Sequence, residues 1–156
     1  MRWTAEAGWS GDARGMADAD LVLVFADAAH FREAACYDEL RARFHRAHIV
    51  GCSSSGSVMG TTISDDDIVA TAIRLERGSV AVATVDVAGQ DISALGRYRM
   101  DFLRADDLRH VLVLSEGLMV NGSELAGGLN VAGVPVTGGM AGDGTRFGQC
   151  RSLYAA

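Results

Sequence analysis

The sequence predicts an α/β fold: a mixed sheet of about six strands with a parallel β-α-β core plus an antiparallel hairpin, and helices packed on the sheet. Two observations favour this class. Continuous apolar runs of strand length, typical of strands buried on both faces of a parallel sheet, alternate with segments of helical periodicity. A length of 156 residues and a hydrophobic content of 49% are also sufficient for one continuous core.

The first β-α-β unit is predicted in the N-terminal third of the chain. An uninterrupted apolar run at 21–25 predicts a buried strand, and Asp27 is suited to cap a helix over 29–44. A short strand is expected at 48–50, ending where the loop from Gly51 to Gly56 begins. The crossover should be right-handed.

Two further strands, at 68–75 and 79–87, are joined by only three residues. Such a short connection predicts an antiparallel hairpin. A second helix is expected over 91–104, and it leads to an inner strand at 110–114.

The last third of the chain completes the predicted sheet. Asn121 and Glu124 have the spacing of a capping box, which predicts a short helix through about Leu129. A strand is expected at 134–137, and 146–154 is predicted as one more strand whose partner is missing.

The domain organisation predicted from these elements is simple. Residues 1–20 are rich in Gly, Ala and Asp with isolated Trp3 and Trp9, and we expect a loosely ordered lead-in. Residues 21–156 are expected to form a single α/β domain.

Composition excludes several classes of function. The net charge is -6 and no basic stripe is present, so nucleic acid is not an expected partner. All basic residues are Arg, and without Lys there is no Schiff-base nucleophile and no Walker-type lysine.

The cysteines and the hydropathy pattern indicate the compartment. Cys36, Cys52 and Cys150 are widely spaced and lack zinc-type spacing, so we interpret them as reduced thiols and expect no metal site. No stretch free of charge reaches membrane-spanning length. The prediction is a cytoplasmic protein without a membrane partner.

Small or polar residues follow four predicted inner strands. If these strands are parallel, their loops meet at one edge of the sheet, where ligands bind in open α/β folds. The alternative is that the glycines and serines only form turns. The predicted ligand-binding residues are Cys52, Ser53, Ser54, Ser55, Gly56, Glu116, Asn121, Gly138, Gly139 and Asp143.

The chemistry of these residues suits a small zwitterion such as an amino acid. Backbone N–H groups and the serine hydroxyls can donate to a carboxylate, while Glu116 and Asp143 can hold an amino group. We expect no basic residue beside either glycine-rich loop, which disfavours a polyanion.

Catalysis is the principal alternative, and the sequence leaves it open while favouring binding. Cys52 follows a strand as a nucleophile does at an elbow, but Gly51-Cys52-Ser53-Ser54-Ser55 departs from the G-x-S-x-G pattern and no base can be named. A hydrolase or transferase using Cys52 therefore remains an alternative to a small, partly buried structural residue.

Four motifs, in order, resemble the FIST N domain. They are Phe25 at the end of the first strand, Ile49 to Gly56, Ser115 to Leu118 with Asn121, and Val136 to Asp143. The resemblance covers about residues 20–144 and implies a sensory module of signal-transduction proteins that binds small ligands such as amino acids. For some members it implies haem-based gas sensing, for which His30 or His110 would be the axial ligand.

The chain also departs from the family pattern. Ser54, Ser55, Gly56 and Ser57 stand where the family commonly has Thr-Ala-Gly-Glu, which removes an acidic side chain from the site. The FIST C half that usually follows is absent, so a fragment of a longer sensor and a stand-alone form are both open. A third function class is an interaction scaffold for such a C-terminal partner or for a homodimer.

Overall fold

The computed structural model describes the chain as two compact units. The first unit comprises Met1–Val80 and Ala141–Ala156, and the second comprises Ala81–Met140. The described residues are 1–32, 34–87, 89, 91–92, 94, 106–130, 133–146, 148 and 150–155.

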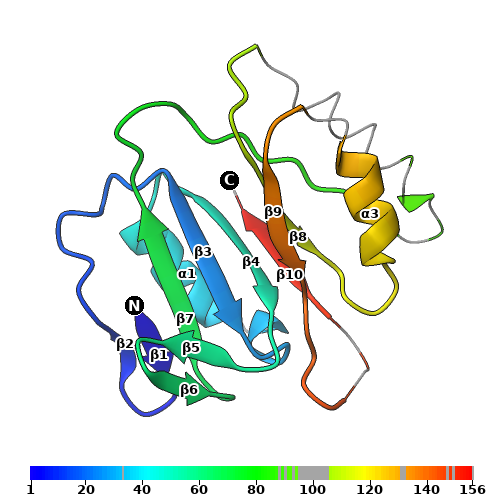
Figure 1. Ribbon diagram of the computed structural model, residues 1–156. Coiled ribbons are helices and arrows are strands. Elements are labelled where there is room, and N and C mark those ends of the chain that lie inside the picture. The colour runs from blue at the N-terminus through cyan, green and yellow to red at the C-terminus, as the bar shows by residue number, and fades with distance from the viewer. Residues whose placement is uncertain are drawn as a thin grey trace. The chain divides into compact units, whose positions relative to one another are not determined.

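Within its described residues, the first unit consists of strands with one α-helix and one 3-10 turn (Figure 1). They are β1 (Arg2–Thr4), β2 (Gly8–Ser10), β3 (Leu21–Ala26), η1 (His30–Arg32), α1 (Ala34–Arg43), β4 (His48–Ser53), β5 (Ser57–Met59), β6 (Thr62–Ser64), β7 (Ile68–Ile73) and β10 (Ser152–Ala155).

A mixed six-stranded sheet organises the first unit, in the order β10-β4-β3-β7-β1-β2. β3 and β4 are parallel and connected through α1, while β7 runs antiparallel to β3. Leu40 and Phe44 at the end of the helix are buried in one cluster with Val22, Val24 and Ile49 of the two strands. The predicted α/β class, with its β-α-β core and mixed sheet, is confirmed.

The hairpin predicted at 68–75 and 79–87 is wrong. Residues 79–87 are described and form no strand. β7 pairs with β3 on one side, and on the other it pairs with β1 through Ile68 and Val69. β7 is therefore paired with strands from the N-terminal part of the chain and not with residues 79–87.

The two ends of the described chain both contribute strands to this sheet. β1 and β2 form an antiparallel pair with Trp3 opposite Trp9, which the composition of residues 1–20 did not predict. The strand predicted at 146–154 forms over Ser152–Ala155 and does have a partner, because β10 pairs antiparallel with β4.

The second unit contains a small parallel sheet covered by a helix. β8 (Val111–Ser115) pairs with β9 (Val136–Met140), and α3 (Gly122–Leu129) packs Leu129 against Val111. These strands therefore form a two-stranded sheet of their own, and their assignment to the same sheet as 21–25 is wrong. The predicted helix at 91–104 lies largely outside the described residues.

None of the described helices is long and apolar enough to cross a membrane.

Candidate functional site

The first unit presents polar residues where β3 and β4 end side by side. β4 continues through Ser53, so Cys52 and Ser53 are strand residues rather than loop residues, three positions beyond the predicted end. The Ser54 N–H donates to Ala26 O at 2.9 Å, which extends the pairing to the last residue of β3. Asp27 and Ser55 thus follow neighbouring strand ends.

Residues 141–146, which follow β9, bind directly to the end of β4 and to the loop after it. Gly142 N donates to Ser53 O at 2.9 Å, and Gly144 N donates to the Ser55 Oγ at 3.1 Å. A Cβ on Gly142 would lie 2.4 Å from the Ser55 Oγ and 3.0 Å from the Ser55 backbone N, so glycine favours this close approach. The end of β4 with the loop after it and the glycine-rich segment after β9 therefore meet through Gly142 and Gly144.

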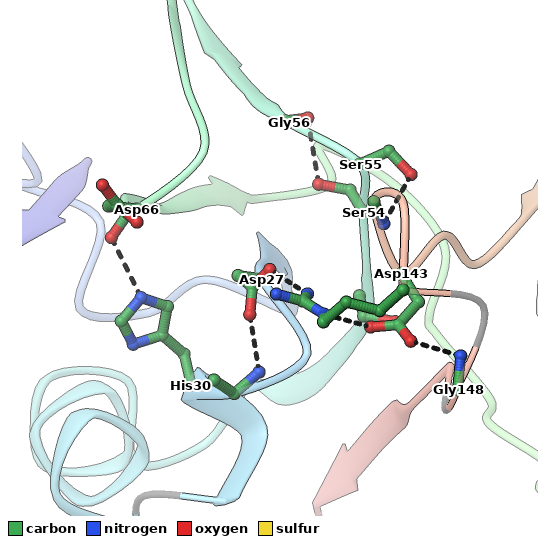
Figure 2. A network of polar contacts seen from close by, with 12 residues as sticks. Asp27, His30, Ser54, Ser55, Gly56, Asp66, Asp143 and Gly148 are labelled. Atoms are coloured by element: carbon green, nitrogen blue, oxygen red, sulfur yellow. Dashed lines mark hydrogen bonds and ion pairs between the residues drawn. The ribbon is translucent and has the colours of Figure 1, made fainter.

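Three charged side chains form a charge network beside this contact: Asp27, Asp143 and Arg146 (Figure 2). The Arg146 Nε donates to Asp143 Oδ1 at 3.1 Å, and its Nη2 donates to Asp27 Oδ2. Asp143 Oδ2 also accepts from Gly148 N at 2.9 Å. The Asp143 side chain is 5% exposed, whereas Arg146 is 54% exposed.

Sequence reasoning missed Arg146, and the expectation that no basic residue flanks the glycine-rich loops is wrong. In the sequence, the indication of an ion pair was that Arg146 stands three residues after Asp143. Asp27 was predicted as a helix cap, and its Oδ1 does accept from Ala29 N at 2.8 Å. Its second oxygen binds Arg146, which lies 119 positions away in the sequence and so has no local pattern.

The electrostatics of Asp27 favour the ionised carboxylate. Burial raises its pKa, but the hydrogen bonds from Arg146 and from Ala29 N outweigh burial, and so the pKa lies below its ordinary value. The charges of Arg146 and His30 act in the same direction. The hydrogen bonds that Arg146 donates to Asp27, the larger effect, and to Asp143 raise the pKa of Arg146.

The three serines have different surroundings. The Ser53 side chain is fully buried, and its Oγ accepts from Arg151 N at 3.0 Å. The Ser54 Oγ donates to Gly56 O at 3.0 Å. Ser55 is exposed and accepts from Gly144, which leaves its hydroxyl proton free to be donated outward.

Cys52 lies in an environment that does not activate a thiol. It is 4% exposed, and burial followed by the charge of nearby Cys150 raises its pKa to about 11. The nucleophile is the thiolate, and this pKa keeps the thiol protonated at neutral pH.

The remaining predicted site residues, Glu116, Asn121, Gly138 and Gly139, belong to the second unit. The Glu116 carboxylate accepts from Leu118 N at 2.9 Å and from Met119 N. Asn121 caps α3 as predicted, because its Oδ1 accepts from the N–H groups of residues 123 and 124. Gly138 and Gly139 are residues of β9 and do not follow its end.

Comparison with known protein families identifies the family of the chain. The model of the FIST N domain matches residues 20–155, nearly the whole chain. The chain belongs to the FIST N domain family. This family is a sensory, signal-transduction family, which supports binding of a ligand or a partner. No curated protein and no solved structure gives a significant match.

The two histidines named as axial ligands for haem, His30 and His110, are each hydrogen-bonded through Nε2. His30 Nε2 is hydrogen-bonded to Asp66 O at 2.9 Å, and His110 Nε2 to Thr137 Oγ1 at 2.8 Å. Each would have to release that contact to ligate iron through Nε2. Among the described residues, no group of three or more His, Cys, Asp and Glu side chains is arranged to hold a metal ion.

Proposed function

We propose that this FIST N domain is the ligand-binding part of an intracellular sensor, and that the ligand is an amino acid or a similar small metabolite. The site lies at the ends of β3 and β4 in the first unit. The observation that carries the proposal is the Arg146 guanidinium, which two carboxylates hold in place while it stays half exposed.

Arg146 is suited to receive the ligand carboxylate. Its Nε and Nη2 bind Asp143 and Asp27, and Nη1 has no further partner among the described residues. A guanidinium held rigidly by its neighbours loses little entropy when it binds a second carboxylate. The exposed Ser55 hydroxyl beside the network adds a donor.

The carboxylates of the network can receive the other end of a zwitterion. Asp27 keeps 19% of its side-chain surface exposed and its lowered pKa keeps it ionised, so it can pair with a ligand ammonium group. Asp143 supports Arg146 from the more buried side. The alternating charges favour an amino acid over a polyanion.

The signalling output is proposed to come from a partner, either a domain such as a FIST C half or a second copy of the chain. Membership of a sensory family supports this part of the proposal. The free thiol of the buried Cys52 supports a reducing, cytoplasmic compartment.

A thermal-shift screen of the common amino acids tests the proposal. A ligand present at about one hundred times its Kd stabilises a protein by about 2.7 kcal/mol, which a melting curve detects readily. We expect at least one amino acid to raise Tm in the wild type and to lose this effect in Arg146→Gln.

Arg74→Gln is the matched control, because Arg74 also pairs with a carboxylate in the first unit and is 53% exposed. It should retain the ligand response. The proposal is wrong if no amino acid raises Tm, or if Arg146→Gln and Arg74→Gln respond to the ligand alike.

A further inference from the structure

The first unit also contains a cavity whose lining residues differ from those of the charge network. It has a volume of about 280 Å³ and is bordered by β1, β2, β5, β6 and β7. Its wall includes Arg2, Ser10, Met59, Thr62, Asp67 and Val69.

An ion pair between distant parts of the sequence forms one side of this cavity. The Arg2 Nε donates to Asp67 Oδ2 at 2.5 Å, and the two residues are 65 positions apart. The Asp67 side chain is 8% exposed and that of Arg2 is 37% exposed. The buried carboxylate therefore holds a guanidinium whose outer part remains accessible.

The Asp67 carboxylate stays ionised in this position. Burial raises its pKa, but hydrogen bonds with Arg2 and Ser64 and the charges of Arg2 and His30 lower it by more. Arg2 is thus oriented through its Nε edge, and its Nη atoms have no other partner among the described residues.

The rest of the wall is part polar and part apolar. Thr62 offers a hydroxyl, and the Ser10 hydroxyl, which donates to Arg2 O at 3.1 Å, still has lone pairs to accept a bond. Met59 and Val69 add apolar surface. Ligand pockets usually measure roughly 300–1,000 Å³, and this cavity of about 280 Å³ lies just below that range, so it fits only a small molecule.

We propose that this cavity binds a small monocarboxylate with a short aliphatic chain, with its carboxylate on the Nη atoms of Arg2 and its chain against Met59 and Val69. The bound Asp67 carboxylate offsets part of the Arg2 charge, which disfavours a dianion such as phosphate. The site is separate from the one proposed at Arg146 and does not depend on it.

Sodium propionate is the probe, with propionamide as its uncharged analogue, and isothermal titration calorimetry on the full chain measures binding. Propionate should bind the wild type and propionamide should not. Arg2→Gln should weaken propionate binding at least about tenfold, because the paired donors are lost. Arg74→Gln, which changes an exposed ion pair outside the cavity, should leave it unchanged.

Met59→Trp is a second variant for the case in which Arg2→Gln unfolds, since Arg2→Gln leaves the buried Asp67 without its cation. Met59 is 39% exposed, so the larger ring can fill the cavity while the Arg2–Asp67 pair is kept. A folded Met59→Trp should lose propionate binding.

Three results with the wild type and Met59→Trp would overturn this second site. They are the absence of propionate binding to the wild type, equal binding of propionamide, and binding that persists in folded Met59→Trp. Loss of propionate binding in Arg146→Gln with retention in Arg2→Gln would assign the carboxylate to the charge network and would reject the cavity.

Discussion

The two parallel strand pairs, β3–β4 in the first unit and β8–β9 in the second, share one structural device. In each pair a glycine of the later strand lies opposite a valine of the earlier one: Gly51 opposite Val24, and Gly138 opposite Val113. An added Cβ would lie 2.2 Å from Val24 O and 1.9 Å from Val113 O. Both pairs therefore require glycine for the close approach of their backbones.

The polar residues beyond the strand ends differ between the two pairs. After β8, Glu116 and Asn121 bind backbone N–H groups within three residues of themselves, so these side chains complete the local fold. After β3, Asp27 binds Arg146 from a distant segment, and the guanidinium stays half exposed. Polar residues at a strand end are thus candidates for a ligand site when distant segments supply them and leave donors accessible.

The largest predicted effect concerns the shared glycines. Gly51→Ala and Gly138→Ala should each lower the free energy of unfolding by about 1–3 kcal/mol, because the new methyl group overlaps a carbonyl oxygen. Urea denaturation followed by circular dichroism measures the change.

Gly139→Ala is the neighbouring control, since a Cβ added to Gly139 would meet no atom within 4 Å. It should change stability by less than about 0.5 kcal/mol. Wild-type stability in Gly51→Ala would show that the two strand pairs do not share this constraint.

An intermediate effect is expected from the helix cap of the second unit. Asn121→Ala removes the acceptor for two N–H groups of α3 and should cost about 1 kcal/mol in urea denaturation. The ligand-binding role predicted for Asn121 stays a prediction, and the same variant tests it in the amino acid screen. A lost ligand response in a folded Asn121→Ala would contradict our view that its role is structural.

The smallest effect is a pH dependence from the charge network. The folded-state pKa of Asp27 is lowered, so its ion pair stabilises the fold at pH values above the unfolded-state pKa of about 3.9. This stabilisation is lost as the pH falls through the folded-state pKa. The wild type should exceed Asp27→Asn in urea midpoint at neutral pH, and the difference should shrink below about pH 4.

The exposed Asp18–Arg74 pair provides the control, and Asp18→Asn should shift the midpoint less than Asp27→Asn at neutral pH. If the difference in urea midpoint between wild type and Asp27→Asn grew on acidification, it would contradict the pH dependence expected from the charge network.

The sequence correctly predicted the elements that depend on neighbouring residues in the chain. The strand at β3, the helix before β4 and the cap at Asn121 each follow from apolar runs or from spacings of a few residues. The partner of β7 and the partner of β10 were not predicted, since pairing between distant strands leaves no local pattern. Glycine is unfavourable inside strands, so the sequence predicted that the strand ends at Gly138. In the structure Gly138 lies inside β9, because its close contact with the backbone of Val113 leaves no room for a Cβ.

The candidate site was predicted only in part for the same reason. The serine loop and Asp143 were identified from composition, and their meeting through Gly142 and Gly144 supports that reasoning. Arg146 was missed because its importance depends on Asp27, more than one hundred positions earlier.

The pairing of β10 with β4 has a consequence for synthesis of the chain on the ribosome. The second unit is inserted within the first, so Ser53 emerges well before Ser152. At roughly 5–20 residues per second, the edge of β4 waits on the order of ten seconds for its partner. An unpaired edge strand can pair with another chain during this interval, so nascent β4 is exposed to aggregation until β10 is made.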